Sequence, residues 1–168
     1  MSAEVERTLI VFKPDAVQRG LVGEILTRFE RVGLKIVGTK MVSPDEKHYH
    51  HHYEEIGQLG TRRGQDTLDI TLQMMLDGPV IAMVLEGVES VDLVRKLVGT
   101  TESKSAAPGT IRGDFSHMSF GYADNKTKGI PNLIHASGDS AEAVKEISHW
   151  FSDDELYAYD VLNEKFTR

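Results

Sequence analysis

Residues 79–85 read Pro-Val-Ile-Ala-Met-Val-Leu, an unbroken apolar run that is bounded by the proline and by Gly87. Such a run is typical of a central strand that is covered on both faces, because a half-exposed strand alternates apolar and polar residues. A strand covered on one face, with an oligomer partner on the other, also fits the run. We therefore expect this stretch to form a central strand of a sheet.

Strand and helix patterns alternate along the chain on both sides of this run. Further strands are expected at residues 8–12, 34–42 and 133–136. Helices are expected where apolar residues recur at helical spacing, at residues 21–32, 66–76, 91–98 and 140–151. Residues 57–65 and 100–131 are expected to form loops. This order predicts one α/β or α+β domain over residues 1–168, compatible with a split βαβ sandwich of ferredoxin type.

Capping sequences mark two helix starts. The sequence Ser-Pro-Asp-Glu at residues 43–46 predicts one start, with Ser43 as the cap and Glu46 completing a capping box. The last long helix is expected to be capped by Asp139 or Ser140. Its apolar face is expected to contain Ala143, Val144, Ile147, Trp150 and Phe151.

Composition narrows the class of protein. The chain has 168 residues, of which 40% are hydrophobic, as expected for one compact domain with a real core. Its formal net charge of -7 argues against a general nucleic-acid binder but leaves room for a local basic pocket. The absence of cysteine excludes disulfides and thiolate chemistry. The sequence shows no signal-peptide pattern and no membrane-spanning stretch, so we expect a cytoplasmic protein that does not bind membranes.

The stretch Asn132-Leu-Ile-His135-Ala-Ser137-Gly-Asp-Ser140 places one histidine at the end of a short apolar run, directly before a helix start. A histidine in this place can expose one ring nitrogen to a ligand while the fold holds the rest of the ring. A lone histidine on an apolar strand is more often a hydrogen-bonded core residue. The functional interpretation of His135 therefore depends on other residues.

Cations and hydroxyl groups near turns supply that support. Lys13 directly follows the strand expected at residues 8–12, so we expect its ammonium group to lie at the end of that strand. Arg112 lies in a turn-rich segment, where its planar guanidinium suits phosphate oxygens. Arg95 and Thr101 flank the expected helix end at Gly99. Together these groups predict a site for a polyphosphate.

In this order along the chain, over about residues 6 to 156, these residues resemble the nucleoside diphosphate kinase family. The resemblance implies a ferredoxin-like fold with an antiparallel four-stranded sheet that helices cover on one face. It implies an enzyme that transfers the γ-phosphoryl group of a nucleoside triphosphate to a nucleoside diphosphate by a ping-pong mechanism, through a phosphohistidine. It also implies Mg²⁺ bound mainly through the nucleotide phosphates, and a homo-oligomer, either a tetramer or a hexamer.

The resemblance assigns the catalytic residues. His135 matches the nucleophile, a role that needs an imidazole that is neutral near pH 7. Glu146 matches the glutamate that orients this imidazole, and Ser137 matches the serine that hydrogen-bonds the pair. Tyr53 matches a tyrosine near the phosphates, and Asn132 matches the asparagine that binds the ribose hydroxyls.

The same resemblance assigns the phosphate-binding residues. Lys13 and Arg112 match cations that offset the charge of the transferred group, which matters because phosphoryl transfer depends on positioning and electrostatics. Arg95 and Thr101 match an arginine and a threonine that contact the β-phosphate.

The chain departs from the family pattern in three places. Gly138 stands where the family has an aspartate, and we expect Asp139 to cap the last helix instead of assisting Mg²⁺. No aromatic residue follows Tyr53 to stack on the base before Gly78, so we expect Arg62 or Arg63 to cover the base, with Ile130 opposite. Residues 115–131 form an expanded loop, and the usual C-terminal extension is not recognisable.

Histidines at positions 48, 50, 51 and 52 raise the alternative of a metal site. We instead expect His48 and His52 to form an i,i+4 pair on a helix surface. The chain contains neither G-x-x-x-x-G-K-[ST] nor G-x-G-x-x-G, which excludes the sequence signatures of a P-loop and a dinucleotide fold.

Two other functions remain open at this stage. A nucleotide-binding regulator or scaffold without turnover would result if the altered segment at Gly138 and Asp139 misplaced His135. A nucleic-acid-binding protein is a further alternative, which the acidic balance disfavours.

Overall fold

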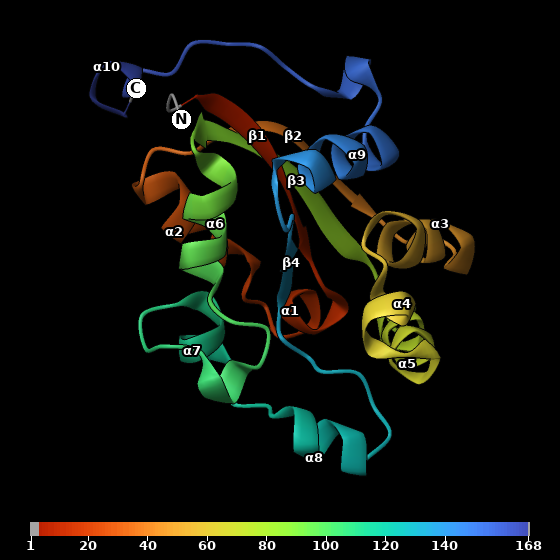
Figure 1. Ribbon diagram of the computed structural model, residues 1–168. Helices are drawn as coiled ribbons and strands as arrows, with labels where there is room; N and C mark the ends of the chain where they lie inside the picture. The colour runs from red at the N-terminus through yellow and green to blue at the C-terminus, as the bar shows by residue number, and fades with distance from the viewer. Residues whose placement is uncertain (1–3, 168) are drawn as a thin grey trace.

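The computed structural model describes residues 4–167, and its centre is a four-stranded sheet with the strand order β2-β3-β1-β4 (Figure 1). All three strand pairs are antiparallel. The strands are β1 (Val5–Phe12), β2 (Lys35–Val42), β3 (Val80–Val88) and β4 (Ile134–Ala136). The apolar run at residues 79–85 therefore forms a central strand, as predicted.

Helices fill the connections between the strands and follow the last strand. The α-helices are α1 (Pro14–Gln18), α2 (Val22–Arg31), α3 (Glu46–His50), α4 (Leu59–Arg63), α5 (Gln65–Met75), α6 (Ser90–Val98), α7 (Ile111–Phe115), α8 (Phe120–Asn125), α9 (Ser140–Trp150) and α10 (Glu164–Thr167). A π-helical turn, η1 (His51–Ile56), continues α3. Two 3₁₀ turns are η2 (Ser103–Ser105) and η3 (Asp153–Glu155).

Helices cover both faces of the sheet, so the expectation of one covered face was wrong. Strand β1 shows the reason. Its last four residues, 9–12, are all apolar, and alternate residues of a strand point to opposite faces of the sheet, so both faces need a cover. Leu9 and Val11 pack into one core with α5 and α9, and Ile10 and Phe12 pack into a second core with α2 and α6. Figure 1 shows α2 and α6 on one side of the sheet and α3, α5 and α9 on the other.

Two segments that were predicted as loops contain short helices. Residues 57–65 hold α4, and residues 100–131 hold α7 and α8. These helices have five or six residues, which is too short to show an apolar period in the sequence. Local caps specify two of them, since the Thr110 and Ser119 hydroxyls accept hydrogen bonds from backbone N–H groups of α7 and α8.

Two details of the predicted helix ends also differ. The cap of α3 is Asp45 and not Ser43, because the Asp45 carboxylate lies three residues before the His48 N–H group and accepts from it at 2.8 Å. In α9 the predicted face packs on the sheet except at Val144, which is 66% exposed.

Asp139 caps α9, which agrees with one of the two predicted caps. Its carboxylate accepts a hydrogen bond from the Glu142 N–H group at 2.7 Å. The cap fixes where α9 begins, and therefore which residues of α9 face β1 and β4.

Replacing Asp139 with alanine should remove this cap and lower the free energy of unfolding by about 1 kcal/mol. For a chain of this size that loss corresponds to a melting temperature lower by roughly 2–4 °C, measurable by thermal denaturation. Asp139→Asn, which keeps an acceptor oxygen, should melt within a degree or so of the natural chain. Equal losses in both variants would contradict a capping role.

Candidate active site

The short strand β4 brings His135 to the end of β1. Val11 pairs with His135 across the two strands, and the Lys13 N–H group donates to the Leu133 carbonyl at 2.9 Å. Leu133 has a positive φ of 75°, an uncommon conformation for leucine. The Asp15 carboxylate accepts from the Leu133 N–H group at 3.0 Å and helps to hold that conformation. Lys13 and His135, far apart in sequence, therefore meet at one strand end.

A buried carboxylate holds the His135 ring. Glu146, on α9, is 1% exposed and lies 2.8 Å from Nε2 of His135 through its Oε1 atom. Its other oxygen accepts from the Ser137 hydroxyl at 2.6 Å, and the same hydroxyl oxygen accepts from the Leu9 N–H group at 3.1 Å. Since an ionised carboxylate only accepts hydrogen bonds, Nε2 carries the proton and Nδ1 keeps a free lone pair.

A second histidine packs against the half-buried His135, and it is buried although the sequence had placed it on the surface. His52 is 1% exposed, and its ring lies edge to face with that of His135 at a centroid distance of 4.4 Å. The Trp150 indole N–H donates to Nδ1 of His52 at 3.1 Å. Burial, and then the neighbouring His135, hold the pKa of His52 well below its usual value. His52 therefore stays neutral.

The expectation of a surface pair between His48 and His52 was wrong because α3 does not continue as an α-helix. The π-helical turn η1 begins at His51 and rotates His52 into the protein. No spacing signal in the sequence indicates a single π-helical turn. The sequence therefore gave no indication of His52 and Trp150 as residues next to the site.

The outer histidines form a stack. The ring of His149 lies 3.9 Å from that of His48 and 4.3 Å from that of His51, with near-parallel planes. Burial, and then the charge of His149, lower the pKa of His48 to about 4. Ring nitrogens hold their lone pairs in the ring plane, so rings that face each other in this way do not converge on an ion.

Within residues 4–167, the group whose ligand atoms lie close enough to hold a metal is His52, His135 and Glu146. Two imidazoles and one carboxylate do not fit Mg²⁺, which prefers an octahedron of oxygen ligands. The Asp139 carboxylate is engaged as a helix cap. The site residues therefore offer no cage for Mg²⁺.

Two buried cations lie beside His135. Lys13 is 7% exposed and donates to the Asn132 side chain at 2.8 Å, while Arg112 is 8% exposed. The Arg112 guanidinium donates to the carbonyl oxygens of Asn132, Ile134 and Gly99 at 2.6–3.2 Å. In the described part of the chain neither cation forms an ion pair with a carboxylate. Two buried positive charges without a carboxylate partner make a site for an anion.

Burial and a neighbouring arginine lower the pKa of each of these two cations. Burial, and then repulsion by Arg112, lower the pKa of Lys13 to about 8. Burial, and then repulsion by Arg95, lower the pKa of Arg112 to about 10. Arg95 itself is exposed on α6, so the structure places it near Arg112 but outside the hydrogen-bonded cluster.

The remaining predicted residues lie around the same cluster. The Asn132 amide N–H₂ group donates to the Thr101 carbonyl at 2.8 Å, which joins Thr101 to Lys13 through Asn132. Tyr53 lies on η1, with its ring 6.2 Å from that of His135 and at a steep angle to it. The buried Tyr53 hydroxyl has no hydrogen-bond partner, and burial raises its pKa. Such an orphaned hydroxyl can serve a ligand oxygen.

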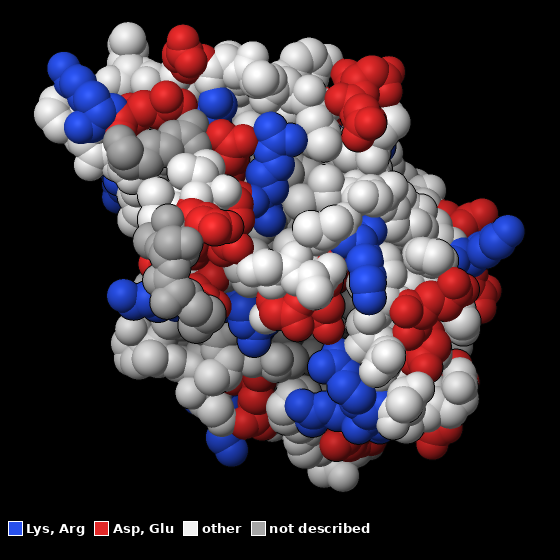
Figure 2. Space-filling model, turned by 45° about the horizontal axis from the view of Figure 1, so that its top comes forward, with Lys and Arg blue, Asp and Glu red and all other residues white. Residues whose placement is uncertain are grey.

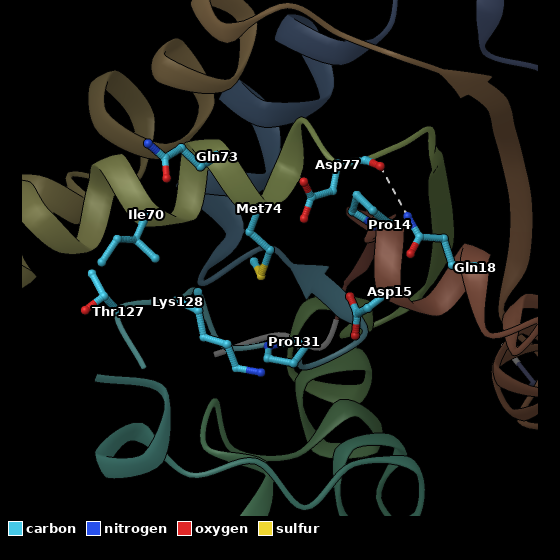
Figure 3. Close-up of a pocket in the computed structure, with 11 residues that line it drawn as sticks. Pro14, Asp15, Gln18, Ile70, Gln73, Met74, Asp77, Thr127, Lys128 and Pro131 are labelled. Atoms are coloured by element: carbon cyan, nitrogen blue, oxygen red, sulfur yellow. Dashed lines mark hydrogen bonds between the residues drawn. The ribbon is translucent and has the colours of Figure 1, made fainter. Parts of the chain in front are cut away.

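A separate cavity of about 330 Å³ lies between α1, α5 and residues 127–131 (Figure 3). Its walls contain Pro14, Asp15, Met74 and Pro131, and it includes none of the predicted phosphate-binding residues. The Asp15 carboxylate links it to the cluster through the Leu133 N–H group. The cavity therefore does not coincide with the cluster around His135, which is identified instead by its buried cations, Lys13 and Arg112.

A histidine that a carboxylate orients, beside buried cations without carboxylate partners, is the arrangement of a phosphotransferase site. The family model "Nucleoside diphosphate kinase" matches residues 6–156. A nucleoside diphosphate kinase of Borreliella burgdorferi is 46% identical over 155 residues, which cover 92% of each chain. One of Pyrococcus furiosus is 46% identical and covers 98% of this chain and 94% of its own.

Solved structures agree with these relatives. A Borrelia burgdorferi nucleoside diphosphate kinase, a transition-state mimic with bound vanadate and ADP, matches with a TM-score of 0.94, 44% identity, and coverage of 97% of this chain and 96% of that chain. A Halobacterium salinarum kinase in complex with CDP matches with a TM-score of 0.82, 40% identity, and coverage of 96% and 97%. The chain belongs to the nucleoside diphosphate kinase family. The predicted fold class and enzyme class are thereby confirmed.

The lowered pKa of Lys13 predicts a pH dependence of catalysis. The ammonium is charged below about pH 8 and is lost above it, so kcat/KM, which reports the free enzyme, should fall as the pH rises through 8. Bound phosphates restore the charge, so kcat should fall at a higher pH than kcat/KM. Lys13→Arg should move the decline of kcat/KM upward. A kcat/KM profile that is flat from pH 7 to roughly 9.5 would contradict this assignment.

Proposed function

We propose that His135 carries the phosphoryl group between a nucleoside triphosphate and a nucleoside diphosphate. This proposal rests on the hydrogen bond between Nε2 of His135 and buried Glu146 at 2.8 Å, beside the cations Lys13 and Arg112, which form no ion pair within residues 4–167. That bond leaves Nδ1 as the nucleophile. The other assigned residues support this atom or the phosphates around it.

In the first half-reaction, the Nδ1 lone pair of His135 attacks the γ-phosphorus. The N–P bond forms as the bond from the γ-phosphorus to the bridging oxygen breaks, and the nucleoside diphosphate leaves with that electron pair. The imidazole becomes cationic, and the Glu146 carboxylate offsets its charge. The Ser137 hydroxyl, through its bond of 2.6 Å to Glu146, holds the carboxylate in place.

In the second half-reaction, a different nucleoside diphosphate binds the same site and its terminal oxygen attacks the phosphorus. The N–P bond breaks and its electrons return to Nδ1, which restores neutral His135. One site serving both nucleotides in turn gives ping-pong kinetics.

Cations stabilise the charge that spreads over the phosphate oxygens. Lys13 and Arg112 contact the transferred group, and Arg95 with Thr101 contacts the β-phosphate. Tyr53 offers its unpaired hydroxyl to the phosphates, and Asn132 binds the ribose hydroxyls. The Borrelia burgdorferi relative, a transition-state mimic with bound vanadate and ADP, supports phosphoryl transfer as the reaction.

Magnesium enters with the substrate. Because the site lacks an oxygen cage, we propose that Mg²⁺ binds the nucleotide phosphates and keeps most of its other ligands as water. It supplies charge neutralisation there, while the chain's own residues position the phosphates.

A regulator or scaffold without turnover is the alternative function. It required the segment at Gly138 and Asp139 to misplace His135. Here the Gly138 N–H group donates to Glu142 and Asp139 caps α9, while His135 keeps its contact with Glu146. This geometry favours the enzyme.

Labelling with γ-labelled ATP tests the nucleophile. The natural chain should acquire an acid-labile, base-stable label, and His135→Ala should lose both the label and transfer to a second diphosphate. Glu146→Gln should label more slowly, on the order of a hundredfold, because a neutral amide cannot offset the imidazolium charge. Glu142→Gln, at a half-buried position one turn earlier on the same helix, is the matched control and should label normally, because a glutamine can still accept the hydrogen bond from the Gly138 N–H group. Transfer by His135→Ala would contradict the proposal.

We also propose that the chain forms one domain and works in the cytoplasm. Among residues 4–167 no helix combines the length and the apolar character that a membrane crossing needs. On the face shown in Figure 2 basic and acidic side chains are interspersed, which disfavours nucleic acid as a main partner.

We propose a homo-oligomer, either a tetramer or a hexamer. Strand β2 is at the sheet edge, and the chain after η3 runs along it, with the Tyr157 N–H group donating to Val37 at 2.7 Å. Large apolar side chains are exposed in this region, at Met41 (59%), Leu162 (98%) and Phe166 (79%). Exposed apolar side chains on an edge strand and on the segment that follows η3 favour pairing with a second copy.

Sedimentation equilibrium at micromolar concentration should show a species several times heavier than the 18.7 kDa chain. Met41→Glu should shift the distribution toward smaller species, since a buried unpaired charge destabilises an interface. Val144→Glu, at an exposed apolar position on α9, should leave it unchanged. A monomer in the natural chain would refute the assembly.

A further inference from the structure

The Glu146 carboxylate lies close to two imidazole rings. Its Oε1 atom is 2.8 Å from Nε2 of His135 and 3.8 Å from Nδ1 of His52. The carboxylate and the His52 ring are both 1% exposed, so water does not compete for this oxygen. A small rotation of the His52 ring would bring Nδ1 within hydrogen-bond distance of the oxygen that holds His135. The protonation of Nδ1 therefore decides whether His52 competes with His135 for Glu146.

The Trp150 side chain controls that proton. Its indole N–H group donates to Nδ1 of His52 at 3.1 Å, and an indole nitrogen can only donate. Nδ1 must therefore present a lone pair. Burial keeps the pKa of His52 well below its usual value, so the ring is neutral and carries its one proton on Nε2. In this tautomer His52 has no proton on the nitrogen nearest Glu146 and cannot donate to it.

The observed tautomer of His52 is not the one that its other neighbours favour. Nε2 of His52 is buried and has no hydrogen-bond partner within residues 4–167, so the proton on it is unsatisfied. A proton on Nδ1 would instead face the Glu146 carboxylate, and hydrogen bonds to a charged group are the stronger kind. Without the indole N–H group, the tautomer with the proton on Nδ1 would be the more stable one. The hydrogen bond from Trp150 is therefore what selects the observed tautomer.

One face of α9 supplies both the carboxylate and the indole. Trp150 lies four residues after Glu146, which is about one helical turn, and both side chains are buried. The turn η1 brings His52 against this face, and strand β4 brings His135. The helix thus presents two polar groups, one turn apart, to two imidazoles. The indole engages His52, and this leaves Oε1 of Glu146 to His135.

We propose that Trp150 is a positioning residue for His135, because its indole N–H group fixes the tautomer of His52 and so reserves Glu146 for His135. The inference rests on the proposed function, in which Glu146 offsets the charge of the His135 ring as it takes up the phosphoryl group. A second donor to Oε1 would draw away part of the carboxylate charge. It would also weaken the hydrogen bond that orients the His135 ring.

Two-bond ¹H–¹⁵N correlation NMR of the full chain, with ¹⁵N in the histidine rings, measures the tautomer directly. Protonated and bare ring nitrogens resonate far apart, and the signals of His52 are those that disappear in His52→Phe. The natural chain should carry the His52 proton on Nε2. Trp150→Phe keeps an aromatic ring but lacks the N–H group, so the proton should move to Nδ1. A proton on Nδ1 in the natural chain, or an unchanged tautomer in Trp150→Phe, would overturn the proposal.

The rate at which γ-labelled ATP labels His135 tests the consequence. Trp150→Phe should slow labelling about tenfold, the effect of weakening one hydrogen bond to a charged group. The double variant Trp150→Phe with His52→Phe has no second donor beside Glu146, so it should label within about threefold of the natural rate. Loss of packing cannot explain such a recovery, because the double variant has lost more of the natural contacts. A double variant no faster than Trp150→Phe would refute the positioning role.

A closer substitute for Trp150 separates the N–H group from the shape of the side chain. The chain has one tryptophan, so benzothienylalanine can be incorporated at that position alone, with sulfur in place of the indole N–H group. This variant keeps the packing and should show the same change of tautomer and the same slower labelling as Trp150→Phe. Natural behaviour in this variant would assign the effect to packing and would contradict the proposal.

His48→Phe is the matched control. The His48 ring packs edge to face on Trp150 at a centroid distance of 4.4 Å, but the hydrogen bond to His52 does not involve it. This variant should keep both the His52 tautomer and the labelling rate, and a changed tautomer would speak against control by the indole N–H group. NMR reports the tautomer without turnover, so a natural chain with the expected tautomer that fails to label His135 would count against the proposed function alone.

Discussion

The hydrogen bond between His135 and buried Glu146 is the interaction on which the rest of the site depends. The two residues lie on different elements, and each element must be fixed for them to meet. Pairing with β1 fixes β4, and the Asp139 cap together with packing on the sheet fixes α9. The Glu146 carboxylate is almost fully buried, which is unfavourable for a charged group. Hydrogen bonds from His135 and Ser137, one to each of its oxygens, offset that cost. The same arrangement fixes which ring nitrogen of His135 is left without a hydrogen bond to Glu146.

The cations obey a different constraint. Within residues 4–167, Lys13 and Arg112 are buried without carboxylate partners, and unpaired buried charge lowers the stability of a folded protein. Arg112 lessens that cost by donating to three carbonyl oxygens, and these bonds also hold the chain that enters β4. One side chain thus supports the strand that carries His135 and supplies charge next to it. The position of His135 and the positive charge beside it are therefore coupled through this residue.

A second layer of side chains surrounds His135. The π-helical turn η1 points His52 and Tyr53 at His135, and Trp150 on α9 hydrogen-bonds His52. Single π-helical turns inside helices are frequent at functional sites, because they redirect one side chain without breaking the helix. The stacked rings of His48 and His149 then join α3 to α9 on the outer side. These contacts keep the two helices that frame His135 at a fixed separation.

The sequence by itself determined the strands, the long helices and the composition of the site. The apolar run at residues 79–85 predicted β3, and the spacing of apolar residues predicted α2, α5, α6 and α9. The resemblance around His135 and Arg112 led to the family. Each of these signals is local, or repeats with the period of one element.

Only the tertiary structure decided what depends on contacts between elements. It showed that both faces of the sheet are covered and that His52 is buried. It also showed that Phe120 meets Arg63 over a separation of more than fifty residues. The physical reason is that α4, α8 and η1 are too short to carry a period, so their directions are set by caps and packing partners elsewhere in the chain.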